Sequence, residues 1–484
     1  MSHAPVEHLD VLIVGAGLSG IGAAATLVRE HPEKSYALVE ARSASGGTWD
    51  LFRYPGVRSD SDMYTLGYRF KPWPGQQALA DGPSILAYVR ETAAEYGVDR
   101  HIRYEHRVTA ADWDSAEARW TVTVQHGDQT VEMTCSLLWV CSGYYDYAAG
   151  HRPHFPGEES FGGALIHPQH WPEGLDYTGK RVVVIGSGAT AVTLVPAMAP
   201  AAAHVTMLQR TPSYVLSVPQ VDPVAAQLGR RLSAQRSYDL VRWKSILVAI
   251  GLYQFSRKAP GTLRRLLRLG TQKALPEGYD VATHFTPPYD PWDQRMCFVP
   301  DGDLFKVLSD GSAEVVTDTV ETFTPTGIRL ASGRELEADV VVAATGLCLL
   351  AFGGAVLSVD GAEVRLPETM AYKALMLAGV PNLVYTVGYT NASWTLKADL
   401  VADFVARLLS FLDEHGYRTV VPMPDDTVAE RPFMDLESGY VLRSLDHLPK
   451  QGDRAPWLLK QNYLADRRLI RRGSLTDGVL HYGS

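Results

Sequence analysis

The sequence predicts an α/β fold with two parallel sheets, and three observations lead to this prediction. A strand, a glycine-rich turn and a helix occur near residue 11, and the same unit occurs again near residue 181. A second apolar strand follows each unit, and strands that alternate with helices are typical of doubly wound sheets. The strand that closes each sheet comes much later in the chain. We therefore expect two Rossmann-like, dinucleotide-binding domains, the second inserted into the first, plus a helical insertion.

This arrangement divides the chain into six segments. The connector between the domains is rich in Pro, Gly, His and Tyr, and the helical insertion has apolar residues at helical spacing. After Gly346 we expect the chain to return to the first domain, where a strand at 381–388 closes the sheet and a helix follows at about 396–415. The expected boundaries are 1–145 and 371–484 for the first domain, 180–220 and 290–370 for the second domain, 146–179 for the connector, and 221–289 for the helical insertion.

Composition excludes several classes of function. The 45 basic and 54 acidic side chains give a net charge of −9, which argues against nucleic-acid binding. Four cysteines without C-x-x-C spacing indicate reduced thiols rather than disulfides or a zinc site. The first ten residues have no basic region typical of a signal peptide, and the longest apolar run, 246–255, is too short to cross a bilayer. We expect a cytoplasmic protein without a transmembrane segment or a metal ion.

The first glycine-rich turn has the surroundings of a nucleotide site. It contains Gly15, Gly17 and Gly20, follows an apolar strand and opens an Ala-rich helix. Glycines let the backbone approach a pyrophosphate, and the helix N-terminus supplies amide donors. The next strand ends at Glu40, where an acid can accept hydrogen bonds from a ribose. The turn alone could be an ordinary strand-to-helix connection, but strand, helix and acid together predict a nucleotide site.

The second glycine-rich turn predicts a site for NADPH rather than NADH. The turn spans 186–191, and the strand that should end in a ribose-binding acid is followed instead by Arg210 and Thr211. An acid would repel a 2′-phosphate, whereas an arginine fork and a hydroxyl can bind it. The alternative is an arginine in a solvated loop.

Two further patterns relate the chain to a known family. The run 161–172 fits F-x-G-x-x-x-H-x-x-x-W-P, and the run 46–60 fits G-G-x-W-x-x-x-x-Y-P-G-x-x-x-D. Both resemble signatures of the Baeyer–Villiger monooxygenases, flavoproteins that insert one atom of O2 beside a carbonyl. The runs 46–67, 166–173, 182–197 and 387–400 extend the resemblance to the mycobacterial ethionamide-activating subgroup.

This resemblance implies bound FAD, NADPH as the reductant, and oxygenation of small ketones and soft sulfur centres. Beside the fingerprint glycines, the FAD contacts that it implies fall on Ser19, Glu40, Thr48, Trp49, Asp50, Leu51, Asp60 and Val108. The NADPH contacts that it implies fall on Arg58, Gly186, Ser187, Gly188, Ala189, Thr190, Ala191, Val192, Arg210 and Thr211. Ser59 is expected to be at the cofactor site as well.

Arg295 and Asp60 are the expected catalytic pair. The resemblance places an arginine of the second domain over the flavin, where a fixed guanidinium can stabilise the negative charge that develops during oxygen transfer. Asp60 can hold this guanidinium in place. The family usually has Lys before this arginine, and this chain has Gln294. The alternative for Arg295 is a surface salt bridge. For His167 and Trp171 in the connector we expect a structural role.

The segment 230–273 is strongly basic, with Asp239 as its one acid. Apolar side chains are interleaved with the basic ones, so this segment could touch the inner face of a membrane peripherally. The alternative, which we favour, is a solvated basic face over a substrate tunnel. The basic residues are Arg230, Arg231, Arg236, Arg242, Lys244, Arg257, Lys258, Arg264, Arg265, Arg268 and Lys273.

The sequence thus predicts an NADPH- and O2-dependent flavin monooxygenase. We expect it to insert oxygen next to a ketone carbonyl and to oxygenate sulfides or thioamides. One alternative is a flavin-containing N- or S-monooxygenase without Baeyer–Villiger activity, which usually has Tyr or Phe where Trp171 stands. A second alternative is a non-catalytic sensor that binds both nucleotides.

Overall fold

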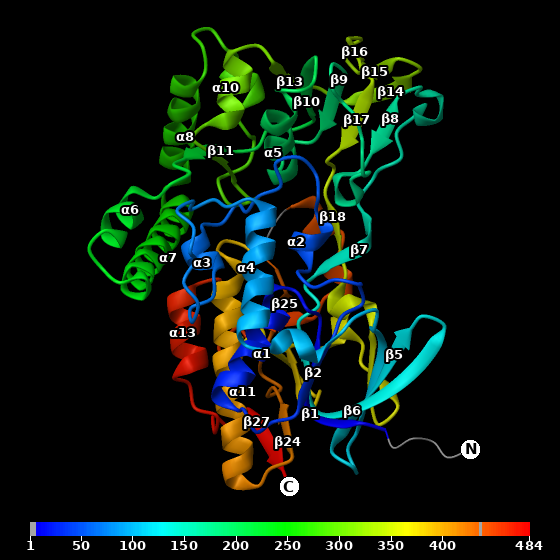
Figure 1. Ribbon diagram of the computed structural model, residues 1–484, viewed down its shortest axis with the longest axis vertical. Helices are drawn as coiled ribbons and strands as arrows, with labels where there is room; N and C mark the ends of the chain where they lie inside the picture. The colour runs from blue at the N-terminus through cyan, green and yellow to red at the C-terminus, as the bar shows by residue number, and fades with distance from the viewer. Residues whose placement is uncertain (1–5, 435–437) are drawn as a thin grey trace.

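Two sheets organise the chain, and the computed structural model describes them through residues 6–434 and 438–484. The larger sheet has nine strands in the order β20-β19-β4-β5-β6-β1-β2-β3, with β23 also pairing with β6. It occupies the lower half of Figure 1. Its strands are β1 (His8–Val14), β2 (Tyr36–Val39), β3 (Ile102–Arg103), β4 (Arg107–Asp114), β5 (Arg119–His126), β6 (Gln129–Val140), β19 (Val356–Val359), β20 (Ala362–Glu363) and β23 (Leu383–Tyr385).

The smaller sheet has five parallel strands in the order β13-β10-β9-β17-β8 and lies in the upper half of Figure 1. Every one of these strands falls between two parts of the larger sheet in the sequence. The predicted fold class, with the second domain inserted into the first, is therefore confirmed. The strands are β8 (Ala164–Ile166), β9 (Arg181–Ile185), β10 (His204–Gln209), β13 (Ala313–Thr317) and β17 (Val340–Ala343).

Three helices pack together next to the larger sheet, beginning at the glycine-rich turn that follows β1. The helix α1 (Leu18–Glu30) follows β1 directly and packs against α11 (Trp394–His415) and α4 (Gly82–Glu95). A glycine in α1 also leaves room for Tyr68, since a Cβ on Gly22 would lie 2.7 Å from the ring of that residue. The core between α1 and β1 is closed to solvent, with Ile13 and Ile21 fully buried.

The chain crosses between the domains twice, and the two crossings pair with each other. The outward crossing contains β7 (Tyr145–Gly150) and the return crossing contains β18 (Leu347–Leu349), which is antiparallel to β7. Two details differ from the expected boundaries. The connector supplies β8 to the smaller sheet, and the larger sheet regains the chain at β19, before the expected residue 371. Both strands are too short to show an alternation of apolar and polar residues in the sequence.

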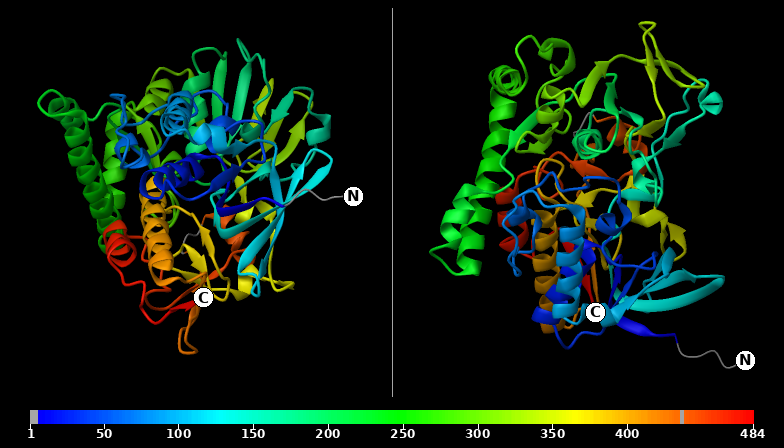
Figure 2. Two further views of the ribbon diagram at one scale, coloured as in Figure 1. Left: turned by 60° about the horizontal axis from the view of Figure 1, so that its bottom comes forward. Right: turned by 45° about the horizontal axis from the view of Figure 1, so that its top comes forward.

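The helical insertion forms one edge of the molecule in all views (Figures 1 and 2). Among the described residues, no helix is long and apolar enough to cross a membrane. The insertion contains α6 (Pro223–Gly229), α7 (Ala234–Lys258), α8 (Pro260–Ala274) and α9 (Val281–His284).

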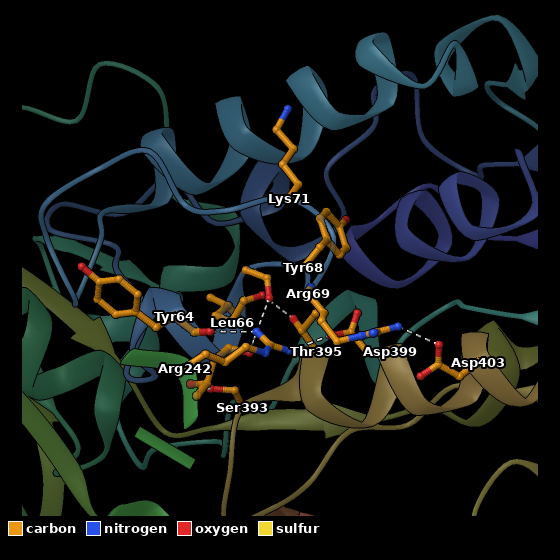
Figure 3. Close-up of polar contacts among 12 residues, drawn as sticks. Tyr64, Leu66, Tyr68, Arg69, Lys71, Arg242, Ser393, Thr395, Asp399 and Asp403 are labelled. Carbon is orange, nitrogen blue, oxygen red and sulfur yellow. Dashed lines mark hydrogen bonds and ion pairs between the residues drawn. The ribbon is translucent and has the colours of Figure 1, made fainter. Parts of the chain in front are cut away.

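Arg242 anchors α7 to the first domain. Its guanidinium donates to the carbonyl oxygens of Tyr64 and Gly67, each at 2.7 Å, and pairs with Asp399 of α11 at 2.6 Å (Figure 3). Arg242 and Asp399 are both buried, and burial raises the pKa of Asp399 to about 6 against the opposing effect of Arg242. Such a pair fixes the side of α7 that faces the protein.

The remaining helices and strands complete the two domains. The helices are α2 (Thr48–Leu51), α3 (Met63–Leu66), α5 (Ala189–Met198), α10 (Asp303–Ser309), α12 (Gly439–Leu442) and α13 (Tyr463–Arg471). The strands are β11 (Val215–Val218), β12 (Cys297–Pro300), β14 (Val320–Thr324), β15 (Gly327–Leu330), β16 (Glu335–Glu337), β21 (Ala371–Tyr372), β22 (Met376–Leu377), β24 (Thr419–Pro422), β25 (Glu430–Pro432), β26 (Lys450–Gly452) and β27 (Leu480–Gly483).

Candidate active site

The first glycine-rich turn forms a cradle that only glycine fits. Gly15 has φ +103°, and a Cβ there would lie 2.7 Å from the carbonyl oxygen of Cys141. A Cβ on Gly20 would lie 1.8 Å from the carbonyl oxygen of Gly15. Gly17 caps α1 without a side-chain hydrogen bond, so the cap residue supplies no acceptor for the amides of the first helical turn. Uncapped amides at a helix N-terminus are donors for a phosphate, so this cradle fits the pyrophosphate of a dinucleotide.

Glu40 lies at the end of β2, beside this cradle. Its carboxylate accepts hydrogen bonds from the backbone amides of Ala16 at 2.8 Å and Arg42 at 3.0 Å. The side chain is buried, and burial raises its pKa. Glu40 therefore holds the turn in shape, while the ribose contact expected from the sequence stays a prediction.

The second glycine-rich turn has the same form but is more open. Gly186 has φ +143°, and Gly188 caps α5 without a side-chain hydrogen bond. Among the described residues, no atom lies within 4 Å of a Cβ placed on Gly188, so this turn is open where the first one is closed. Ser187 donates from its hydroxyl to the carbonyl oxygen of Thr211 at 2.8 Å, which joins the turn to the loop after β10. Arg210 is exposed in this loop and forms no ion pair with a described residue.

Asp60 and Arg295 meet across the two domains. Asp60 lies between α2 and α3, and Arg295 lies just before β12 of the second domain. The guanidinium makes two contacts with the carboxylate, Nε to Oδ2 at 3.1 Å and Nη2 to Oδ1 at 3.2 Å. Asp60 raises the pKa of Arg295 above its usual value. The arginine is therefore a fixed positive charge, and its side chain remains 33% exposed.

Three tyrosines near this pair were not expected from the sequence. The phenol oxygens of Tyr144 and Tyr145 lie 3.2 Å apart, and Tyr440 comes from α12 near the C-terminus. Burial raises the pKa of all three, while the charge of Arg295 acts in the opposite direction. Neutral phenols thus lie within range of the charge of Arg295, and no motif in the sequence pointed to them.

A tryptophan connects these tyrosines to the first glycine-rich turn. The ring of Trp394 stacks on Tyr144 with ring centres 5.0 Å apart and an angle of 19°. Its indole nitrogen donates to the hydroxyl of Ser19 at 2.7 Å. Because Trp394 is the first residue of α11 and Ser19 is in the first turn of α1, the two helix N-termini lie side by side.

Several polar side chains of the loop 46–60 form hydrogen bonds or ion pairs with other residues of the protein. The hydroxyl of Thr48 lies 3.0 Å from that of Tyr147. Asp50 is buried and pairs with Arg42 and Arg90, each at 2.7 Å. These ion pairs fix the loop, so the carboxylate of Asp50 has a structural partner already.

The side chains of Arg58 and Ser59 also bond to groups of the protein. Arg58 pairs with Asp303 of α10 at 2.5 Å and so joins the loop to the second domain. Ser59 donates to the carbonyl oxygen of Ser61 at 2.8 Å. The other expected cofactor residues are Trp49 and Leu51 on α2, Val108 on β4, and Ala189, Thr190, Ala191 and Val192 on α5. Val108, Ala191 and Val192 are buried in hydrophobic cores, and the cofactor contacts of the whole set stay predictions.

His167 of the connector forms a hydrogen bond with the return crossing between the domains. Its Nε2 donates to the carbonyl oxygen of Gly346 at 3.1 Å, and its Nδ1 accepts from the amide of Gln169 at 3.2 Å. The ring lies against Gly150, where a Cβ would be 1.9 Å from it. Burial lowers the pKa of His167. These contacts fit the structural role expected for it, and Trp171 packs against the core of the second domain.

Comparison with known proteins places this arrangement in a family. A flavin-binding monooxygenase-like family matches residues 76–230, and an NAD(P)-binding Rossmann-like domain matches residues 13–71. The FAD-containing monooxygenase EthA of Mycobacterium tuberculosis is 59% identical over 478 residues, 98% of this chain and 98% of that protein. The probable FAD-binding monooxygenase AlmA of Acinetobacter baylyi is 48% identical over 480 residues, 98% of this chain and 96% of that protein.

Solved structures share the fold at lower sequence identity. An oxidized steroid monooxygenase bound to NADP has a TM-score of 0.77 at 23% identity, covering 99% of this chain and 100% of that chain. The OTEMO complex with FAD and NADP has a TM-score of 0.70 at 24% identity, covering 86% and 88%. Because its relatives match over nearly the whole length, the chain belongs to the family of FAD-containing monooxygenases of the EthA type.

Proposed function

We propose that this monooxygenase inserts one oxygen atom of O2 next to the carbonyl of a small ketone, forming an ester or lactone, and oxygenates sulfides or thioamides. The observation that carries the proposal is the bidentate pair of Asp60 and Arg295, which joins the two domains. The chemistry that the cofactors would supply is hydride transfer from NADPH to FAD and activation of O2.

The protein's own residues would bind and orient these cofactors. The uncapped amides of α1 would hold the FAD pyrophosphate, and those of α5 would hold that of NADPH. Arg210 and Thr211 would bind the 2′-phosphate that distinguishes NADPH from NADH. Residues 48–51 and Val108 would contact FAD. Arg58 would contact NADPH, while its ion pair with Asp303 holds the loop 46–60 against the second domain.

Arg295 would act through its charge rather than as an acid. Asp60 raises the pKa of Arg295, so the guanidinium keeps its protons and can stabilise an oxyanion that forms next to it. The half-buried phenols of Tyr144, Tyr145 and Tyr440 would reduce the access of water to this charge, which strengthens its effect. These three groups stay neutral at ordinary pH because burial raises the pKa of each.

Product analysis tests this function against the flavin-containing N- or S-monooxygenase. The holoenzyme would be supplied with NADPH, isotope-labelled O2 and a panel of ketones and sulfides. We expect esters or lactones that carry one labelled oxygen, together with sulfoxides. Sulfoxides alone, with every ketone recovered unchanged, would favour the alternative function.

A further inference from the structure

The outward face of the helical insertion combines exposed apolar side chains with unpaired basic ones. The longer helix, α7, buries Val241 and Ile246 and exposes a stripe on its other side at spacings of three and four residues. Large apolar side chains are seldom left in water in such a group. The exposed apolar residues of α7 and α8 are Leu240, Trp243, Leu247, Val248, Phe255, Leu266 and Leu269, with exposed fractions between 36% and 60%.

The anchoring of α7 explains why this face points outward. Arg242 lies on the opposite side of the helix from Leu240 and is held by Asp399 and by backbone carbonyl groups of the first domain (Figure 3). The helix therefore cannot turn its apolar stripe inward without breaking a buried ion pair. Both α7 and α8 lie along the outer edge of the molecule in every view (Figures 1 and 2).

Ion pairs divide the basic residues of the segment 230–273 into two groups. Four of them bind carboxylates outside the segment: Arg242 with Asp399, Lys244 with Asp222, Arg257 with Asp293, and Arg264 with Asp290. The others form no ion pair with a described residue, and all are exposed in the same segment as the apolar stripe, in a chain of net charge −9. These free cations are Arg230, Arg231, Arg236, Lys258, Arg265, Arg268 and Lys273.

We propose that this face docks on the surface of a lipid bilayer that contains anionic headgroups. Apolar side chains at the level of the headgroups, with basic side chains around them, are the features of a helix that lies in the membrane interface. Trp243 lies at the border of this face, where its ring meets Tyr463 edge-on and Arg467 lies over it, and it remains 36% exposed. An indole ring at such a border suits the membrane interface because it has both an apolar body and a polar N–H group. Each free cation near an anionic surface would increase partitioning by about fivefold.

Charge argues against a second copy of the chain as the occupant. A symmetric dimer would place the same face of two copies together, and the free cations of one would then lie against those of the other. An anionic bilayer has the opposite charge and so matches both parts of the face. The proposal concerns where the enzyme binds and is independent of the reaction proposed above.

Vesicle co-sedimentation of the FAD-loaded full chain tests the proposal. We expect binding to vesicles of phosphatidylcholine mixed with phosphatidylglycerol, weaker binding to phosphatidylcholine alone, and release at high salt. Arg265→Glu with Arg268→Glu, and Leu247→Glu with Val248→Glu, should each weaken binding by at least about tenfold. The matched controls are Arg107→Glu with Arg119→Glu, and Val356→Glu with Met423→Glu, which change exposed residues elsewhere and should bind like the wild type.

A fluorescence readout locates the contact on α7. The emission of Trp243 should shift to the blue when the vesicles are added, and Trp243→Phe should remove the shift while the other tryptophans stay unchanged. The proposal is wrong if anionic vesicles do not bind the wild type at low salt, or if both paired variants bind as the controls do. It is also wrong if Leu247→Glu with Val248→Glu converts a wild-type dimer into a monomer in sedimentation and leaves vesicle binding unchanged.

Discussion

The two glycine-rich turns follow the same strand–turn–helix order but have different surroundings. In the first, Leu18, Ser19 and Gly20 are all buried, and Trp394 of α11 bonds to the turn. In the second, Gly188 and Ala189 are exposed, and Arg210 points into solvent without an ion pair among the described residues. A ligand in the first turn would be enclosed by protein, whereas a ligand in the second could exchange with solution. This contrast suits a cofactor that stays bound and a reductant that comes and goes.

Breaking the contact between Asp60 and Arg295, which joins the domains that carry the two turns, should have the largest effect. We expect Arg295→Ala to abolish measurable ester formation, because losing one fixed donor to an oxyanion costs about 3–4 kcal/mol and losing a full charge costs more. Arg295→Lys should fail too, since an ammonium cannot make the two parallel contacts with Asp60. NADPH oxidation should continue and release hydrogen peroxide. Product and peroxide assays measure both results.

Arg264→Ala is the control for this prediction, because it removes an arginine of the insertion that pairs with Asp290. It should leave ester formation close to the wild-type rate. Ester formation at a normal rate in Arg295→Ala would show that Arg295 is not catalytic and would remove the basis of the proposed function.

Exchanging one residue between the turns should reveal how differently they are packed. The first turn has Gly20 where the second has the fully buried Ala191. Gly20→Ala would place a Cβ 1.8 Å from the carbonyl oxygen of Gly15, so we expect a loss of about 3 kcal/mol in stability and of most bound FAD. Ala191→Gly should cost only about 1 kcal/mol through its lower helix propensity. Flavin absorbance after gel filtration and thermal unfolding would measure the two effects, and equal losses would contradict the comparison.

Removing Arg210, which lies in the loop beside the second glycine-rich turn, should change coenzyme preference. Arg210→Ala should weaken NADPH binding by roughly tenfold to a hundredfold and leave NADH nearly unaffected. Anaerobic flavin reduction at several concentrations of each coenzyme gives both affinities. Arg230→Ala, another exposed arginine without an ion pair among the described residues, is the matched control. Equal reduction by NADPH and NADH in the wild type would refute the assignment.

The smallest expected effect concerns the connector between the turns. Burial lowers the pKa of His167, so the folded protein favours the neutral ring. The stability that this provides is present above the pKa of the unfolded chain, about 6.5, and is lost as the pH falls below it. Protonation would also remove the acceptor for the amide of Gln169, a loss of about 1 kcal/mol.

Thermal unfolding between about pH 8 and about pH 5 measures this effect. The unfolding temperature of the wild type should fall more than that of His167→Gln. His154→Gln is the control, because His154 is an exposed histidine of the same connector. Parallel pH profiles for the wild type and His167→Gln would contradict the prediction.

Local patterns made most of the fold predictable. Each strand, glycine-rich turn and helix is contiguous in sequence, so the bounds of α1 and β9 follow closely from apolar periodicity and glycine placement. The strands β8 and β19 were missed because each is short and takes its place only by pairing with a distant strand. The pairing of Asp60 with Arg295 was expected from the family resemblance rather than from spacing.

The tyrosines of the site could not have been found in this way. Tyr144 and Tyr145 lie in a crossing between domains, and Tyr440 comes from a short helix near the C-terminus. A lone tyrosine carries no motif, and only the folding of three distant segments onto one another brings these phenols to Arg295. The sequence likewise showed the basic residues of the insertion, but not which of them are neutralised by carboxylates.

The pairing of β7 with β18 makes the inserted domain an exchangeable cassette. Gly150 and Leu347 are direct partners in the two crossing strands, so the chain enters and leaves the second domain at one point. Domains with adjacent ends can be transplanted with little disturbance to their host. The segment between these positions could therefore be exchanged among relatives, which would combine different coenzyme preferences and membrane affinities with one FAD domain. The exchanged segment must keep an arginine that contacts Asp60 as Arg295 does.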